Sequence, residues 1–232
     1  MLAFFLPLAA YAAEPVGWWT FEGESPLLDR SGHWAEVELS GTARLSEGAL
    51  ELRGKTSGSS STAVGWAGAR GYTGPALASK TQVVWLRLVQ PQVRGGAAMS
   101  VDSLDGSGVF DAIVWAELRP RRWEAGSNYY SRSQTVPQAD ETGTGVVQLA
   151  RADRVDGDAV WVTLCRGATV LGTYRDGPAG RWAPENAVIR FGQRHTSANV
   201  ETTGGLSADL LEARLFSEAL TCALVGALAM VR

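Results

Sequence analysis

The sequence predicts an all-β protein, folded as a sandwich of two antiparallel sheets with a short C-terminal helix. Short apolar runs recur along the 232 residues, and no long stretch has convincing helical periodicity. Clusters of Gly, Ser and Asp separate these runs, and the 27 Gly and 9 Pro are typical of a chain with many turns. The length suits one large β-domain, so we expect a single domain rather than several.

The clearest predicted strand spans residues 159–165, because its apolar side chains alternate between two faces. Val160, Val162 and Leu164 share one face of this run. The sequence 166–168 then contains a Gly that suits a hairpin turn. The nearly continuous apolar run 109–118 predicts a strand that is covered on both faces. The other strand-like runs span residues 16–21, 49–53, 82–88, 169–174, 188–195 and 206–216.

The remaining segments are interpreted as loops and a terminal helix. The Gly-rich residues 90–108 suit a pair of long loops, and the polar residues 127–145 suit a second surface excursion. The apolar tail 219–231 is too short to span a membrane. Its Ala, Leu and Met favour a short helix packed against the edge of the sandwich.

Composition excludes some classes of function. The formal net charge is −3, whereas nucleic-acid-binding domains usually carry a basic excess. The nine Trp are a heavy aromatic load. Such side chains fill a core between sheets or form a platform for a ligand.

Residues 1–13 resemble a secretory signal peptide, so the mature domain is expected to span residues 14–232. A short apolar run is followed by Ala10-Tyr11-Ala12, which matches an A-x-A cleavage site. The run has no Lys or Arg before it, and a buried N-terminal strand is the alternative. The signal-peptide interpretation predicts a secreted, periplasmic or cell-surface protein.

The two cysteines, Cys165 and Cys222, lie at the end of a predicted strand and in the predicted terminal helix. An exported protein could join them in a disulfide. Two separate buried thiols are the alternative, and spacing does not decide between them.

Several motifs follow one another in an order that resembles a known family. They are WTFE at 19–22, DRSG at 29–32, GALEL at 48–52, WVT at 161–163, YRDG at 174–177, FG at 191–192 and EARLFSEALT at 212–221. Together they resemble the laminin-G-like, concanavalin-A-like jelly-roll domain over most of residues 16–225. The runs FDAIVWAE at 110–117 and WEAGS at 123–127 are similar to modules of exported planctomycete-type bacterial proteins.

The resemblance implies a two-sheet antiparallel jelly roll. As a tendency of the family, it also implies binding of carbohydrate or glycoprotein, sometimes with calcium. In those bacterial proteins the module accompanies cytochrome-c-like and other domains, whereas this sequence ends directly after the predicted sandwich. If the chain belongs to that group, we expect a stand-alone or truncated module.

The sequence disfavours an enzyme. A glycosidase needs two carboxylates flanking the scissile bond. Glu36 with Glu38, and Asp156 with Asp158, come closest, but the first pair lacks the third acid of the jelly-roll glucanase motif and the second is interpreted as part of a turn. No Gly-x-Ser-x-Gly or Cys-x-x-Cys motif is present. His33 is interpreted as a residue of an exposed turn.

No cofactor is expected, with calcium as the alternative. Asp153, Asp156 and Asp158 lie within six residues, and calcium requires several converging oxygen ligands. Their spacing is not that of an EF-hand, and Arg154 lies among them. A solvated hairpin is therefore the favoured interpretation.

Aromatic and polar residues in or beside predicted loops form the candidate ligand site. Aromatic planes stack on the C–H face of a sugar, while Asn and Arg bond to its hydroxyls. The arginines before Trp123 would suit an anionic glycan. A structural role is the alternative for the aromatic residues and for the histidine. The predicted site comprises Trp123, Asn128, Tyr129, Tyr130, Arg194 and His195.

We therefore expect a non-catalytic, extracytoplasmic module that recognises carbohydrate or a cell-surface glycoconjugate. We expect it neither to bind nucleic acid nor to have a stable membrane span. A structural domain that packs against another protein or domain is the alternative. A divergent glycoside hydrolase is a third, disfavoured one, because the required carboxylate pattern is missing.

Overall fold

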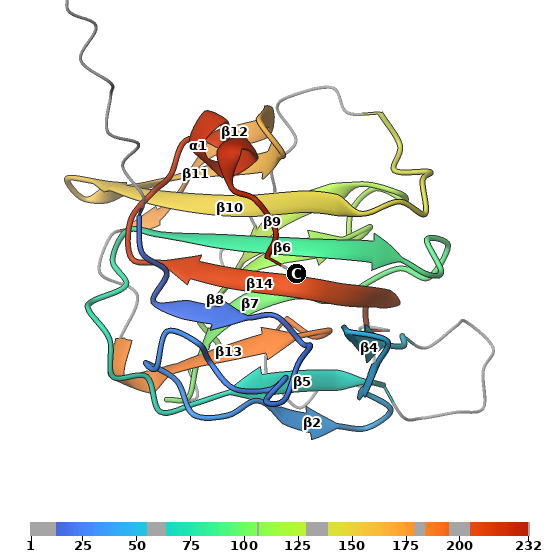
Figure 1. Ribbon diagram of the computed structural model, residues 1–232. Helices are drawn as coiled ribbons and strands as arrows, with labels where there is room; N and C mark the ends of the chain where they lie inside the picture. The colour runs from blue at the N-terminus through green and yellow to red at the C-terminus, as the bar shows by residue number, and fades with distance from the viewer. Residues whose placement is uncertain are drawn as a thin grey trace, which may run out of the picture.

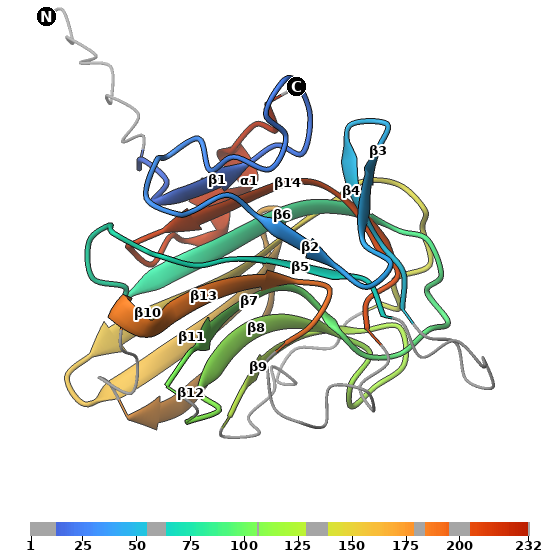
Figure 2. The same cartoon turned by 90° about the horizontal axis from the view of Figure 1, so that it is seen from below.

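The computed structural model describes residues 13–54, 64–105, 107–128, 139–178, 184–194 and 205–231. These residues form a sandwich of two antiparallel sheets, seen as two layers in Figure 2. The eight-stranded sheet has the order β12 (Thr169–Pro178), β11 (Ala159–Arg166), β10 (Val147–Asp156), β6 (Lys80–Leu88), β14 (Ala208–Phe216), β4 (Ala49–Leu52) and β3 (Arg44–Ser46), with β1 (Gly17–Trp19) also paired to β14.

The six-stranded sheet forms the second layer. Its order is β2 (Glu38–Ser40), β5 (Trp66–Ala69), β13 (Ala187–Phe191), β7 (Ala97–Ser103), β8 (Phe110–Trp115) and β9 (Trp123–Ser127). The described helical segments are the 3-10 turn η1 (Pro184–Asn186) and α1 (Cys222–Ala227). The predicted fold class, a two-sheet sandwich with a short C-terminal helix, is confirmed.

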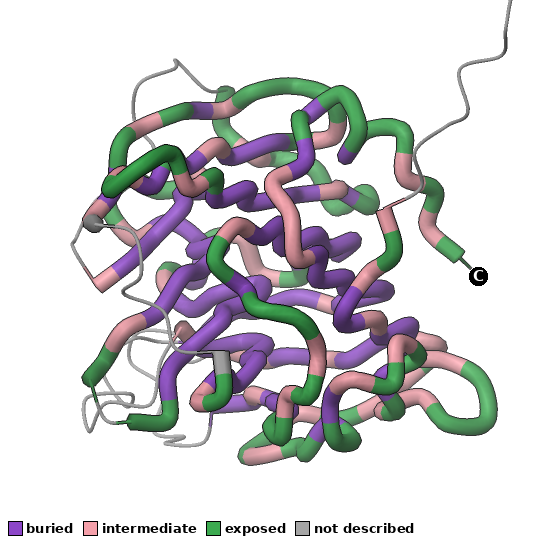
Figure 3. Tube along the Cα trace, turned by 90° about the vertical axis from the view of Figure 1, so that its left-hand side faces the viewer, coloured by how far each residue is buried: buried purple, intermediate pink, exposed green. Residues whose placement is uncertain are grey.

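The main core lies between the sheets and follows the alternation of each strand. On β11, Val160, Val162 and Leu164 enter this core, as predicted. All six residues of β8 are buried, which confirms that both of its faces are covered. Figure 3 shows the buried segments concentrated in the strands and the exposed ones in the connections.

A group of charged side chains is also buried between the sheets. Arg151 on β10 donates to Asp111 on β8 at 2.7 Å and to Asp153 at 2.8 Å. Lys80 on β6 lies 2.6 Å from Asp111 and 2.8 Å from Asp153. Asp176 on β12 lies 3.6 Å from Arg151. The opposite charges compensate one another where no water can solvate them.

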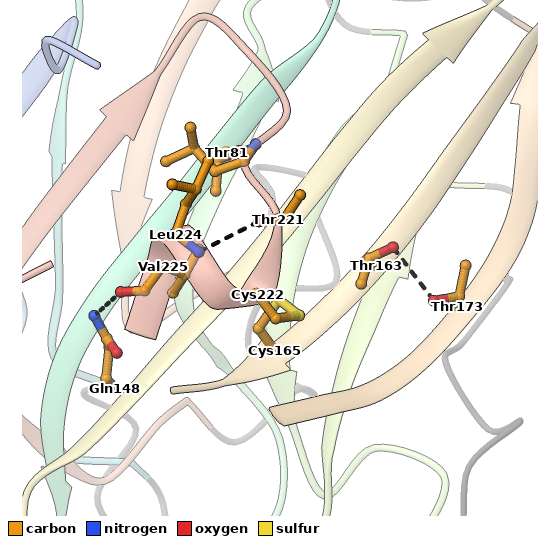
Figure 4. Close-up of a disulfide and its surroundings, with 10 residues drawn as sticks. Thr81, Gln148, Thr163, Cys165, Thr173, Thr221, Cys222, Leu224 and Val225 are labelled. Carbon is orange, nitrogen blue, oxygen red and sulfur yellow. Dashed lines mark hydrogen bonds between the residues drawn. A yellow bond between two sulfur atoms is a disulfide. The ribbon is translucent and has the colours of Figure 1, made fainter. Parts of the chain in front are cut away.

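The C-terminal tail forms a second core on the outer face of the eight-stranded sheet (Figure 1). A disulfide joins Cys165 on β11 to Cys222 on α1, so the two cysteines do meet (Figure 4). Val225 packs over the sheet, and its carbonyl accepts from Gln148 Nε2 at 2.7 Å. Thr221 caps the helix, because its hydroxyl accepts from the Leu224 N–H.

Two sequence-based expectations are corrected. The segment 90–108 contains β7 rather than loops alone, because small and polar residues alternate with buried apolar ones there. The tail packs on a face of the sandwich rather than at its edge, and only residues 222–227 are helical. Trp161 lies on the outer face of β11 and is 38% exposed, so it is not a core residue.

The predicted signal peptide falls almost wholly on residues 1–12, which lie outside the described residues. Among the helices that the structure describes, none is long and apolar enough to cross a membrane.

Candidate functional site

The outer face of the six-stranded sheet has a floor of small side chains. One cross-strand row runs over five strands through Gly68, Arg190, Ser100, Ala112 and Gly126. Four of these five positions carry a hydrogen, a methyl or a hydroxymethyl group. All five positions are buried, and Arg190 is the one long side chain among them. The row continues on β2 with the exposed Glu38 opposite Gly68.

Arg190 organises the part of this face nearest β5. Its Nε donates to Asp102 Oδ2 at 3.0 Å, and both side chains are almost fully buried. Burial lowers the pKa of Arg190, and the Asp102 carboxylate opposes that effect by favouring the cation. The guanidinium carbon lies 4.8 Å from the Trp66 ring centroid, a cation–π distance. The ion pair and the stacking together fix the half-buried indole on the face.

Gly68 leaves the space in which this arrangement fits. A Cβ at this position would lie 2.7 Å from the Ile189 carbonyl oxygen and 3.5 Å from Cζ3 of Trp66. The first of these distances is shorter than van der Waals contact, so a larger residue would push β5 away from β13. The small residue therefore keeps both the strand pairing and the position of the indole.

Arg194 follows β13 and crosses the face towards β8. Its carbonyl accepts a hydrogen bond from the Ser100 hydroxyl, which fixes the backbone over the floor. Its guanidinium carbon lies 5.9 Å from the Phe110 ring centroid, and the guanidinium forms an ion pair with Glu117. Both partners of that pair remain 22% exposed, so an incoming ligand can reach them.

Two buried polar atoms on this face have no hydrogen-bond partner in the structure. They are Nε of Arg194 and Oδ1 of Asn128, which directly follows β9. One is a donor and the other an acceptor. Leaving such groups unpaired costs about 1–3 kcal/mol each. A hydroxyl group, which both donates and accepts, suits either atom.

Three carboxylates of this face are engaged, whereas a fourth, Glu38 on β2, lies opposite Gly68 and is exposed. Asp102 is paired with Arg190 and Glu117 with Arg194. Glu124 on β9 is buried, and it accepts from the backbone N–H groups of Leu118 and Arg119. These contacts orient the three groups as hydrogen-bond acceptors, which suits recognition of hydroxyls.

The structure separates the predicted site residues. Asn128 and Arg194 lie on the outer face of the six-stranded sheet. Trp123 instead begins β9 and points into the core, where it is 2% exposed and its ring centroid lies 4.7 Å from that of Trp115. Its indole is packed and unavailable to a sugar ring in this structure, so we assign it to the core. Tyr129, Tyr130 and His195 lie outside the described residues.

Sequence reasoning did not single out Trp66, Ser100, Asp102, Glu117 or Arg190. A signal was present in β7, where Ser100 and Asp102 alternate with the apolar Met99 and Val101. A similar alternation places Arg190 between Ile189 and Phe191. Polar residues at every second position of a buried strand indicate a face that is not core.

The three acids weighed for calcium do not converge. Asp153 points into the interior and contacts Lys80 and Arg151. Asp156 is exposed at the end of β10 and lies 3.3 Å from Arg154. Asp158 occupies the hairpin turn that follows. Throughout the described part of the chain, no group of three or more His, Cys, Asp or Glu residues is arranged to hold a metal ion.

Comparison with known proteins identifies the fold without a family. No protein-family model matches the sequence, and no curated protein matches it. The fold resembles a Trypanosoma rangeli sialidase solved with the inhibitor DANA, with a TM-score of 0.63 and 11% identity over 95% of this chain and 33% of the sialidase. A second structure of that sialidase, in complex with sialic acid, has a TM-score of 0.61 and 10% identity over 90% of this chain and 31% of the sialidase.

Botulinum neurotoxins also share the fold. The chain is similar to a type C neurotoxin structure whose description concerns interaction with two ganglioside molecules, with a TM-score of 0.56 and 13% identity over 85% of this chain and 47% of the neurotoxin chain. It therefore spans about a third of the sialidase and about half of the neurotoxin chain. Identities this low establish a shared β-sandwich and no more.

Proposed function

We propose that the protein is a non-catalytic, extracytoplasmic recognition module that binds carbohydrate on the outer face of the six-stranded sheet. The observation that carries this proposal is that a donor, Arg194 Nε, and an acceptor, Asn128 Oδ1, are both buried without a hydrogen-bond partner. A half-buried indole, Trp66, and the accessible ion pair of Arg194 with Glu117 lie on the same face. This set matches the C–H faces and hydroxyls of a sugar.

Two considerations support recognition over hydrolysis. Asp102, Glu117 and Glu124 are held by cations or backbone N–H groups, whereas a glycosidase needs two carboxyl groups that flank the scissile bond, one of them free to donate a proton. Cell entry of the similar type C neurotoxin depends on interaction with two ganglioside molecules, which supports a binding role for this fold. The similarity to a sialidase keeps hydrolysis as an outcome that the experiment must test.

The extracytoplasmic location and the laminin-G-like assignment belong to the same proposal. The Cys165–Cys222 disulfide supports the location, because disulfides persist mainly in oxidising compartments. The two-sheet architecture and the order of the sequence motifs support the laminin-G-like assignment.

Glycan-array binding of the purified protein tests the proposal, run with calcium and with a chelator. The variants Trp66→Ala and Asn128→Ala remove the stacking surface and the unpaired acceptor. We expect each to weaken retention by about threefold to tenfold, the effect of one or two lost contacts. Arg44→Gln is the matched control, because Arg44 is exposed on β3 of the other sheet.

Three outcomes would overturn the proposal. Wild type bound to no glycan would remove its basis, and equal retention of wild type and both variants would exclude this face. Release of a monosaccharide from a bound glycan would show hydrolysis and reject the non-catalytic role. Circular dichroism of each variant establishes that it is folded before binding is compared.

A further inference from the structure

A second face of the molecule carries an exposed tryptophan between two arginines. On the outer face of the eight-stranded sheet, Trp161 of β11 lies directly opposite Arg154 of β10 and Arg175 of β12. The three Cα atoms form one cross-strand row, with neighbours about 5 Å apart. Trp161 is 38% exposed, and both arginines are exposed. This row lies on the opposite sheet from the site proposed above.

The next row along the strands is polar. Thr163 and Thr173 lie opposite each other, and their hydroxyls are 3.3 Å apart. Figure 4 shows the two side chains meeting on the face that carries the disulfide and α1. Two hydroxyl groups therefore lie in the row next to the one that contains Trp161.

The charges of the row are available for a ligand. Arg154 contacts Asp156 at 3.3 Å, but both side chains are about 60% exposed, and pairs this exposed contribute little. Arg175 makes no ion pair with any residue that the structure describes, and within the same residues neither guanidinium stacks on Trp161. Asp158 lies in the adjoining turn and is exposed. Two cations therefore flank an open aromatic ring in a chain whose net charge is −3.

We propose that this row, the Arg154–Trp161–Arg175 surface, binds an acidic polysaccharide. A sugar ring stacks its C–H face on Trp161, and carboxylate or sulfate groups on that ring or its neighbours pair with Arg154 and Arg175. The hydroxyls of Thr163 and Thr173 bond to the sugar hydroxyls. The flat strand surface suits an extended chain that crosses the sheet edge at β12.

A polysaccharide fits this surface better than a nucleic acid. Nucleic-acid affinity depends mainly on neutralising many phosphates, and proteins that bind this way usually present a broad basic patch. Among the residues that the structure describes, two cations flank the ring, and the net charge of the chain is negative. A sparse arrangement of charge around one stacking residue suits a ligand with one acidic group every sugar unit or two.

Affinity electrophoresis through gels that contain polygalacturonate, dextran sulfate or neutral dextran tests this proposal on the full protein. Polygalacturonate carries carboxylates and dextran sulfate carries sulfates, so the two gels identify the acidic group. We expect retardation in at least one acidic gel and none in neutral dextran. The retardation should fall as salt rises through about 0.15 M, because salt screens exposed ion pairs.

Two variants localise the binding. Trp161→Ala should weaken the apparent affinity about tenfold, and the double variant Arg154→Gln with Arg175→Gln should weaken it at least as much and remove most of the salt dependence. Matched controls are Leu28→Ala, which shortens another exposed apolar side chain, and Arg44→Gln on the far edge of the same sheet. Both should bind as wild type does.

No retardation of wild type in either acidic gel would overturn the proposal, as would unchanged binding by Trp161→Ala and by the double arginine variant. Binding to a single-stranded oligonucleotide but to neither polysaccharide would reject the assigned ligand. Because this surface and the Trp66 face lie on opposite sheets, Trp66→Ala should leave retardation unchanged. Failure of one proposal is therefore distinguishable from failure of the other.

Discussion

Arg151 of the eight-stranded sheet reaches across the interior to Asp111 of the six-stranded sheet, with Nη2 and Oδ1 2.7 Å apart and both side chains fully buried. The contact joins the two layers by a charge pair within a buried cluster of charged side chains. Asp153 and Asp176 raise the negative charge around the same guanidinium, and Lys80 provides a second cation. The pKa of Arg151 is raised because nearby carboxylates favour the cation more than burial disfavours it.

Arg151→Met should destabilise the fold by about 3–5 kcal/mol, because it leaves buried carboxylates without their main partner. Denaturant unfolding followed by circular dichroism measures this loss. Arg44→Gln breaks an exposed pair with Glu51 and should change the unfolding free energy by less than about 1 kcal/mol. Similar losses for the two variants would contradict the view that the interior pair joins the sheets.

Removing the disulfide should release the C-terminal tail. Cys165 and Cys222 are 57 residues apart, and a cross-link over a loop of this size contributes about 2–4 kcal/mol. Cys165→Ala with Cys222→Ala should lower the unfolding free energy by that amount and increase hydrogen exchange at the Val225 and Leu228 amides. Unchanged exchange at those amides would show that the packing of the tail alone holds it in place.

Truncating two of the tryptophans should lower the unfolding free energy by very different amounts. Trp123→Ala should cost about 3–5 kcal/mol, because its indole is packed against Trp115 in the core. Trp161→Ala should cost less than about 1 kcal/mol, because much of that side chain is in water. Equilibrium denaturation of the two variants provides the comparison, and a loss for Trp161→Ala that matched Trp123→Ala would place Trp161 in the core after all.

High pH should destabilise the protein through Tyr72. Burial and the charge of Asp29 raise the pKa of Tyr72 from its ordinary 10.0 to about 12, so the unfolded chain loses this proton first. The contribution is fully present below pH 10.0 and is lost as pH rises through about 12. Tyr72→Phe should remove this part of the alkaline decline in unfolding free energy. An identical decline in the variant would assign the loss to other groups.

The alternation of side chains explains which parts of the fold could be predicted. β11 could be predicted because Val160, Val162 and Leu164 share one face, and because Gly167 lies in the turn that leads to β12. β7 and β10 were not predicted because polar residues interrupt their apolar pattern. In β7 such a residue is Ser100, which faces outward, and in β10 it is Arg151. In β10 that polar residue points into the interior, where a buried charge cluster replaces apolar contacts.

The candidate site was harder to predict because it depends on strand order. Arg190 and Asp102 are 88 residues apart in sequence and meet only because β13 pairs with β7. Trp66 reaches them through the pairing of β5 with β13. Proximity to a predicted loop was a poor guide, since Trp123 begins a strand and faces the core. The disulfide likewise required the tail to fold back onto β11.

Glycan-array retention of wild type beside Trp66→Ala and Asn128→Ala tests the central claim most directly. The account predicts that wild type is retained on at least one class of glycan, and that both variants lose about threefold to tenfold in affinity while Arg44→Gln does not. Retention that is the same for all four proteins would contradict it, because the outer face of the six-stranded sheet would then take no part in binding.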